Sequence, residues 1–464
     1  MPNLVELLTS VTNRSLLGKA SLVLLGCIAA MLSVPYAQAQ TFVVLHTFRK
    51  NDGSFPNAGI TLDPNENNLW GVTAYGGLLN CDPGGTVGCG VLFKLTQRNS
   101  RWTFSVPYVF PGNDNGLLPT FPSQIAFGPS GTPYGAELEG GSLLAGSVYN
   151  LFTNVSASNS NSPWTHGMLH QFGSGNDGAY PYQIMVDHSG NIFGATGFGG
   201  TFNLGTVYEL SPSGQSWTEN TLYDFAGGAD GQVPRNVVSD EAGNLYGTTD
   251  QGGNAGCSPF KGCGTIFELT RSGSVWTKTI LHAFQQDTEG GYPGPLMRDS
   301  SGNLFGLTSQ NGPNNLGTIW ELSPSKGAWA FTVLYSFTQQ TVEDKGPFAP
   351  VMDASGVLYG FNNSGGTNNC GSGEFKALCG NIYKLTPSSS GWNYTDLYDF
   401  ALDNGGCFPV GPPAVDTAGN LYGVTYGCGA GEVGVVFKFT PQAGARSPTT
   451  AVSWPFHSLT GFER

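Results

Sequence analysis

A repeated unit of roughly 53–63 residues constrains the fold of this 464-residue chain more than any other feature. One element of the unit ends in Phe, most often as Leu-Tyr-x-Phe or Leu-His-x-Phe, and six of its seven copies carry a Trp eight residues before the Phe. Because eight is an even separation, we expect the Trp and Phe rings of each copy to lie on one face of an extended strand. The seven copies end at Phe48, Phe110, Phe172, Phe225, Phe284, Phe337 and Phe400.

Two further elements recur in constant order with the first. An apolar strand ends in a turn of the form Asp-x-x-Gly-Asn and is followed by an aliphatic-aromatic-Gly triplet, as in residues 187–194 and 240–247. An Asp that binds its own backbone, followed by a Gly that tolerates positive φ, is typical of a hairpin turn. The third element starts at Gly and runs apolar-aromatic-x-Leu, as in residues 205–210.

Each unit therefore contains four short strands. We name them a (before the Asp turn), b (the aromatic-Gly strand), c (the Gly-led strand) and d (the strand that ends at Phe). Four antiparallel strands repeated seven times predict an all-β fold, a seven-bladed β-propeller over residues 40–442, with strand a innermost in each blade. A single blade cannot bury both of its faces, so neighbouring blades must supply the core.

The two ends of the chain offer competing ways to close the ring. Residues 41–48 form a strand d that can complete the last a-b-c set, which ends near residue 440. The tail, residues 443–464, contains Trp454 and Phe462, which are also eight residues apart. Pro455 lacks a backbone donor and weakens this second candidate, so we expect the N-terminal strand to close the ring.

The first 39 residues have the pattern of an export signal. Arg14 and Lys19 precede an apolar run over residues 20–32, and the small-residue site at residues 37–39 is suited to cleavage. The run is too short to span a bilayer, and no later segment is apolar enough to do so. The mature protein is thus expected to be secreted or held at the cell surface. The alternative is a lipid anchor at Cys27, which ends a Leu-Leu-Gly-Cys sequence similar to a bacterial lipobox.

Cysteine usage fits an exported protein. Eight cysteines follow the signal segment, and they fall into four closely spaced pairs. None of the pairs has the C-x₂₋₄-C spacing of structural zinc sites, so we expect disulfides in place of a zinc site. We predict no cofactor and assign no metal ligand, and calcium binding through the abundant oxygen ligands stays open. The predicted pairs are Cys81 with Cys89, Cys257 with Cys263, Cys370 with Cys379, and Cys407 with Cys428.

The repeats resemble the bacterial GloVer-type tandem-repeat family, often described as choice-of-anchor repeat proteins. The resemblance covers about residues 41–442 and depends on the recurrence of Asn-Leu-Tyr-Gly, Gly-Thr-Val-Tyr-Glu-Leu and Leu-Tyr-Asp-Phe. It implies an exported surface or extracellular protein with a β-propeller-like fold, and it implies no reaction. Family members are expected to differ in a C-terminal sorting segment. Here residues 443–464 are polar and contain no apolar anchor.

The alternation of strand direction places the b–c and d–a loops on one face of the ring, which we name the b–c face. Loops of variable length on a rigid scaffold commonly bind ligands. The d–a loops repeat an acidic residue beside Gly, which can form an acidic ring for a cation or basic ligand, or can simply cap turns. No Asp-x-Asp-x-Asp-Gly calcium loop occurs. The acidic residues are Asp52, Asp114, Asp177, Asp230, Glu289, Asp344 and Asp403.

Candidate catalytic residues are those that depart from the repeat. Strand b normally ends Gly-x-Thr, but the second unit has Glu137 in place of Thr, with Glu139 two residues later, and the fourth unit has Asp250 just after its Thr. Such carboxylates can act as acid and base on a glycosidic bond if they converge, or they can be solvated loop-edge residues. His46, His170 and His282 occupy a repeat position that holds Tyr elsewhere, which favours a structural role.

Composition excludes one class of function and favours another. A net charge of −13 with only 11% charged residues argues against nucleic-acid binding. Abundant aromatic and Asn/Asp side chains favour a monomeric binding or scaffold module for an extracellular ligand, with a glycan as the candidate. The alternatives are an extracellular carbohydrate-active hydrolase or lyase and a purely structural surface protein. Carboxylates around a pocket on the b–c face would favour an enzyme, and a flat aromatic surface would favour binding.

Overall fold

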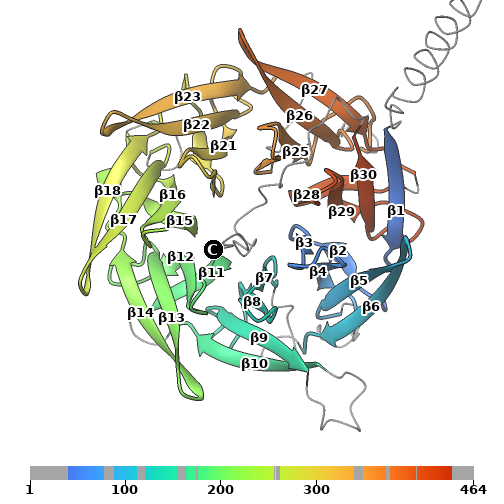
Figure 1. The fold of residues 1–464 in the computed structure, drawn as a ribbon, viewed down its shortest axis with the longest axis horizontal. Helices are drawn as coiled ribbons and strands as arrows, with labels where there is room; N and C mark the ends of the chain where they lie inside the picture. The colour runs from blue at the N-terminus through green and yellow to red at the C-terminus, as the bar shows by residue number, and fades with distance from the viewer. Residues whose placement is uncertain are drawn as a thin grey trace, which may run out of the picture. The chain divides into compact units, whose positions relative to one another are not determined.

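Seven antiparallel sheets are arranged in a ring (Figure 1). The computed structural model describes residues 40–77, 88–111, 121–153, 164–173, 176–254, 256–257, 262–338, 348–371, 377–403 and 405–441. Within these residues the regular structure is β-strand, apart from the short 3₁₀ helix η2 (Gly228–Asp230). In this part of the chain, no helix is long and apolar enough to cross a bilayer. The predicted seven-bladed propeller is confirmed.

Each of the first four blades follows the order a-b-c-d from the centre of the ring outward. Blade 1 consists of β2 (Ser54–Pro56), β3 (Thr61–Leu62), β4 (Asn68–Tyr75), β5 (Val91–Arg98) and β6 (Arg101–Val109). Blade 2 consists of β7 (Ala126–Phe127), β8 (Pro133–Glu137), β9 (Ser147–Thr153) and β10 (Trp164–Gln171). Blade 3 consists of β11 (Gly178–Val186), β12 (Ile192–Gly199), β13 (Thr206–Ser213) and β14 (Ser216–Asp224). Blade 4 consists of β15 (Gln232–Ser239), β16 (Leu245–Gln251), β17 (Thr265–Ser272) and β18 (Val275–Ala283).

The remaining blades repeat this order, with strand a split in blade 5 as it is in blade 1. Blade 5 consists of β19 (Gly291–Pro293), β20 (Met297–Arg298), β21 (Leu304–Gln310), β22 (Thr318–Ser325) and β23 (Ala328–Ser336). Blade 6 consists of β24 (Val351–Met352), β25 (Leu358–Asn362), β26 (Asn381–Ser388) and β27 (Gly391–Asp399). Blade 7 consists of β28 (Cys407–Val415), β29 (Leu421–Gly427), β30 (Val435–Thr440) and β1 (Thr41–Thr47).

Blade 7 closes the ring with strands from both ends of the propeller. β1 pairs antiparallel with β30, in a register that sets Thr41 opposite Thr440 and Thr47 opposite Val435. The Phe42 ring also stacks on Tyr398 of blade 6 at a centroid distance of 4.2 Å. The N-terminal strand therefore occupies the strand d position, as expected. The export signal, the lipid-anchor alternative at Cys27 and the tail over residues 443–464 lie outside the described residues.

The a–b turns follow the chemistry predicted from the Asp-x-x-Gly-Asn motif. In blade 3, the Asp187 carboxylate accepts hydrogen bonds from the backbone N–H groups of Ser189 and Asn191, both at 2.8 Å. Its second oxygen accepts a bond from the Asn191 side-chain amide at 2.9 Å. Gly190 adopts a φ of 84° inside the turn. The same network recurs at Asp240 and Asp299.

Two close contacts explain why Gly precedes strand c: a carbonyl of strand b in every blade and, in five blades, the proline of the next blade. Gly264 has a φ of 96°, and a Cβ on it would lie 2.8 Å from the Pro293 Cγ atom of the next blade. The residue before that proline, Tyr292, has a φ of 56° and donates its backbone N–H to the Cys263 carbonyl at 3.1 Å. Positive φ recurs at this start of strand a in six blades, at Phe55, Phe121, Tyr180, Val233, Tyr292 and Phe408.

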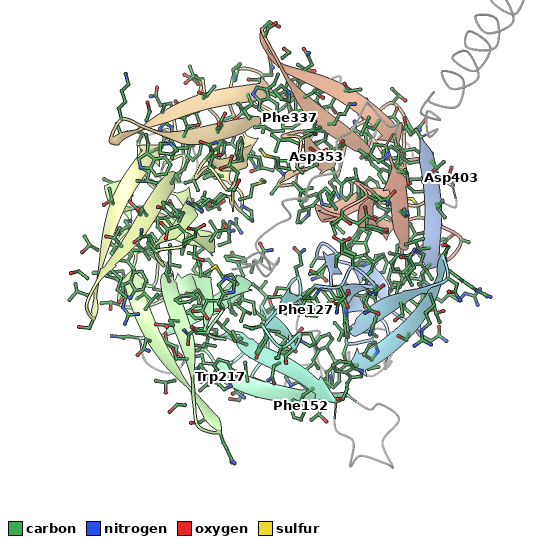
Figure 2. The ribbon with its side chains drawn as sticks, in the orientation of Figure 1. Phe127, Phe152, Trp217, Phe337, Asp353 and Asp403 are labelled. Carbon is green, nitrogen blue, oxygen red and sulfur yellow. A yellow bond between two sulfur atoms is a disulfide. The ribbon has the colours of Figure 1, made fainter. Side chains whose placement is uncertain are left out.

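Strand d does not keep its Trp and Phe rings on one face, so that expectation was wrong. The register between β13 and β14 shifts by one residue at Leu222, because the strand contains a β-bulge there. Trp217 consequently packs toward blade 2, in a cluster with Tyr134, whereas Phe225 packs toward blade 4. Strand d thus contributes core side chains to both of its neighbours, and these fill the spaces between the blades (Figure 2).

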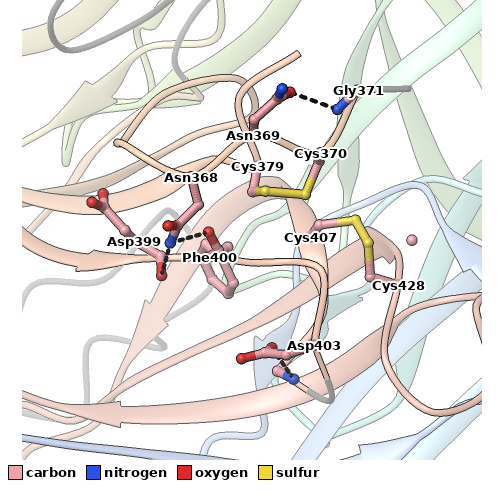
Figure 3. The surroundings of a disulfide bond; sticks show 12 residues. Asn368, Asn369, Cys370, Gly371, Cys379, Asp399, Phe400, Asp403, Cys407 and Cys428 are labelled. Carbon is pink, nitrogen blue, oxygen red and sulfur yellow. Dashed lines mark hydrogen bonds between the residues drawn. A yellow bond between two sulfur atoms is a disulfide. The ribbon is translucent and has the colours of Figure 1, made fainter. Parts of the chain in front are cut away.

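Disulfide bonds link residues at the b–c face. The structure contains the predicted bonds Cys257–Cys263, Cys370–Cys379 and Cys407–Cys428, and the last two lie close together (Figure 3). Cys89 is also disulfide-bonded, and its predicted partner Cys81 lies outside the described residues. Disulfides are compatible with an extracellular protein.

Candidate functional site

The described acidic residues of the d–a loops already have partners within the protein, and Asp230 also forms an ion pair with Lys278 of blade 4 at 2.7 Å. The Asp177 carboxylate accepts a hydrogen bond from the backbone N–H of Gly173 at 3.0 Å, and it lies 3.1 Å from Nε2 of His170. Asp52 with His46, and Glu289 with His282, repeat this arrangement. Asp230 accepts a hydrogen bond from a Tyr hydroxyl instead, and Asp403 accepts one from the backbone N–H of Gly405. Asp114 and Asp344 lie outside the described residues, so ligand binding by an acidic ring remains a prediction.

The His and Tyr partners of these acids form stacks between blades. The His46 ring lies 3.5 Å from the Phe104 ring of blade 1, with an interplanar angle of 5°. His282 stacks in the same way on Phe331 of blade 5, at 3.9 Å. A flat ring with a polar edge can stack on the next blade and bind its own loop, which explains why His and Tyr alternate at this position.

His166 occupies the position of Phe104 and Phe331 in blade 2. Its ring lies between Tyr149 and Tyr108, at centroid distances of 4.7 and 5.5 Å, and its Nε2 has no hydrogen-bond partner among the described residues. Burial lowers the pKa of His166 to about 4. The folded protein therefore holds this histidine neutral at a pH where the unfolded chain protonates it.

We expect His166→Phe to remove part of the acid sensitivity of the fold. Between pH 6.5 and about 4, the unfolded state binds a proton at His166 that the folded state does not, so stability falls as the pH falls through this window. The loss is about 2 kcal/mol between pH 7.5 and pH 5. Urea unfolding at both pH values should show the variant gaining this amount over the wild type at pH 5. His188→Gln, at an exposed turn, is the control, and an equal acid loss in wild type and His166→Phe would contradict the prediction.

The structure places Glu137 in a buried bridge at the end of β8. Its side chain is 4% exposed, and Oε2 accepts a hydrogen bond from the Ser147 hydroxyl at 2.7 Å. Blade 3 has the same bridge between Thr196 and Thr206, at 2.9 Å. Glu137 therefore takes the place of the repeat threonine that joins strands b and c. Glu139 is half-buried just beyond the strand.

Asp250 lies at the end of β16 and forms an ion pair with Arg235 of β15, at 2.9 Å. Blade 3 separates it from Glu137, so the structure does not bring the two proposed carboxylates into one catalytic pair. Glycosidases place such a pair about 5–9.5 Å apart. A role for either residue in acid–base chemistry remains a prediction.

A row of aromatic rings that the sequence pattern did not reveal lies where strand a begins and strand b ends. Tyr426, Phe55, Tyr75 and Phe121 follow one another with centroid distances of 5.0, 6.0 and 5.9 Å. They belong to blades 7, 1 and 2, and we name them the aromatic arc. Tyr426 is 40% exposed, and the other three are half-buried.

Backbone strain positions the aromatic arc. Phe55 and Phe121 have φ angles of 53° and 47°, a conformation that costs a non-glycine residue about 1–2 kcal/mol. The joint between blades holds this conformation, because Phe55 donates its backbone N–H to the Val433 carbonyl of blade 7 at 3.0 Å. The aromatic-Pro pairs that open strand a were the available sequence signal for these residues.

Within the described residues, one group of side chains gathers closely enough to hold a metal ion. It consists of Cys370, Cys407 and Cys428, whose sulfur atoms lie within 4.8 Å of one another. All three are in disulfides, as Figure 3 shows, so they offer no thiolate ligand.

Comparison with known sequences agrees with the repeat pattern and the blade geometry. Residues 158–373 match the family described as the Gloeobacter/Verrucomicrobia repeat. The matched stretch, just under half of the chain, is similar to Gloeobacter/Verrucomicrobia repeats. These repeats correspond to blades 3 to 5 together with parts of blades 2 and 6. No curated protein matches the chain.

Solved structures resemble the fold of this chain at low sequence identity. A fungal alcohol oxidase of the AA5 family, in complex with copper, matches with a TM-score of 0.50 and 14% identity, covering 88% of this chain and 77% of that one. A polysaccharide lyase matches at 0.47 and 9%, covering 88% and 94%. A gluconolactonase from Xanthomonas campestris matches at 0.39 and 12%, covering 72% and 96%. At these identities the likeness concerns the fold alone.

Proposed function

We propose that this repeat protein is an exported binding module whose aromatic arc receives a glycan. The observation that carries the proposal is the continuous row of partly exposed rings across blades 7, 1 and 2. The C–H faces of sugar rings are apolar, and each square ångström of apolar surface removed from water contributes about 25 cal/mol. Rings fixed on strands of a closed propeller also lose little conformational freedom when a ligand binds.

We also propose that the protein is exported and that it is a monomer. Three disulfides on the b–c face are suited to an oxidising compartment, and residues 1–39 have the pattern of a cleaved signal. A carbohydrate-active hydrolase or lyase receives less support, because Glu137 and Asp250 each have a protein partner and lie in different blades.

The arc can be tested by removing two of its rings. We expect Tyr75→Ala/Tyr426→Ala to weaken retention on an insoluble-polysaccharide panel by about 30–150-fold, because each of the two lost stacking contacts is worth about 1–1.5 kcal/mol. Phe152→Ala is the matched control. It removes a ring of similar exposure, 44%, from the c–d end of β9 on the opposite face. Unchanged retention by the double variant would reject the arc, and no retention of the wild type on any polysaccharide would reject the function.

A further inference from the structure

Blade 4 contains a charged pair that no other blade repeats. Arg235 follows the proline of strand a, where the described blades otherwise have Asn57, Ser123, Tyr182, Gly294 and Val410. Asp250 follows the threonine of strand b, and its counterparts include Ala74, Gly197 and Ser309. Six blades form without this ion pair, so the propeller fold does not require it.

Two contacts fix the position of the Arg235 guanidinium. It lies over the Tyr182 ring of blade 3 at 4.8 Å, and Nη2 pairs with Asp250 Oδ2 at 2.9 Å. The Tyr182 ring is itself held against the Gly197 backbone, where a Cβ would come within 2.9 Å of it. Stacking and pairing together fix the plane of the guanidinium, so its remaining N–H groups point in a defined direction.

Arg235 and Asp250 line a small cavity between blades 4 and 5, of about 180 Å³. This volume equals about six water molecules, which is the scale of a single sugar ring. Tyr292 contributes to the wall and donates its hydroxyl to the Cys257 carbonyl at 2.7 Å. Arg235 Nε and Nη1, and Asp250 Oδ1, form no hydrogen bond within the described residues. The cavity is lined by Arg235, Asp250, Gln251, Tyr292, Ser309 and Gln310.

We propose that the Arg235–Asp250 cavity is a second subsite, which binds neighbouring hydroxyl groups of a neutral sugar. The pair presents the N–H donors of Arg235 beside an acceptor oxygen of Asp250. Each of two adjacent sugar hydroxyl groups can accept a hydrogen bond from the guanidinium and donate one to the carboxylate. The Gln310 amide supplies a further donor and acceptor at the rim. An acidic sugar fits less well, because its carboxylate would compete with Asp250 for the guanidinium. This inference rests on the proposed function and names the class of ligand.

Two substitutions distinguish a neutral ligand from an acidic one. We expect Arg235→Gln and Asp250→Asn each to weaken binding of neutral methyl glycosides, measured by calorimetry, at least tenfold. If the site took an anion, Asp250→Asn would instead strengthen the binding of methyl glucuronoside. Stronger binding of the uronoside by Asp250→Asn would overturn the proposal.

The control must separate recognition from folding. Arg271 stacks on Trp276 at 5.7 Å in the same blade but lies at the c–d turn on the opposite face, so Arg271→Gln should leave glycoside binding unchanged. The double variant Arg235→Gln/Asp250→Asn leaves no unpaired charge, and its melting temperature should stay within a few degrees of the wild type. If it melts normally and binds methyl glycosides as the wild type does, the subsite is wrong. Loss of polysaccharide retention in the arc variant would still support the proposed function.

Discussion

A chain that lacks residues 40–48 is expected to show no cooperative thermal unfolding. The deletion removes β1, which supplies the fourth strand of blade 7, and it removes the fully buried Phe48, which contacts Phe93 and Phe104 of blade 1. Loss of a buried Phe side chain alone costs about 3–5 kcal/mol. The exposed edge of β30 would also become a template for aggregation. Near-UV circular dichroism during heating measures the effect.

Deletion of residues 443–464 is the control for this experiment. β1 already pairs with β30, so the tail is not needed to complete blade 7, and its removal should leave the melting curve unchanged. Adding a peptide of residues 40–50 to the chain without β1 should restore a cooperative transition. If that shortened chain melts cooperatively within a few degrees of the full protein without the peptide, closure by β1 is not needed for stability.

Gly264→Ala is expected to destabilise the protein by about 3–5 kcal/mol. The new Cβ would clash with the Thr249 carbonyl and with the Pro293 ring, and the φ of 96° is itself unfavourable for alanine. Neither contact can relax easily, because one is backbone and the other is a proline at the joint with blade 5. The urea concentration at the unfolding midpoint measures the loss.

Gly214→Ala provides the matched comparison. Gly214 also has positive φ, 65°, but at this c–d turn nothing lies within 4 Å of the position that a Cβ would take. Its substitution should cost only the conformational strain, about 1 kcal/mol. Equal losses for the two variants would show that backbone conformation, and not the contact between blades, selects glycine before strand c.

Local chemistry made much of the fold predictable. Asp187 and Gly190 encode a turn within four residues, and paired cysteines such as Cys370 and Cys379 lie close in sequence. Seven copies of these local signals then define the number of blades. The choice of closing strand was also accessible, since Pro455 made the competing tail a poor strand.

The features that were missed depend on register and on neighbouring blades. A bulge at Leu222 reverses the alternation of strand d, and counting residues along a sequence does not reveal such an insertion. The αL conformation of Phe55 is imposed by the Val433 carbonyl of another blade. Arg235 and Asp250 are separated by a hairpin, so their pairing follows from the register of β15 and β16. The candidate site was therefore less predictable than its scaffold.

Closure by β1 has a consequence for how the chain matures. β1 is synthesised about 390 residues ahead of the start of β30, and until β30 appears it has no partner in its own molecule. During that interval, the same hydrogen-bonding edge is available to the β30 of another nascent chain, which is the route to domain swapping. The β1 of the same chain and the β1 of a neighbouring chain then compete for each β30. The local concentration of newly made chains determines how many rings close within one molecule.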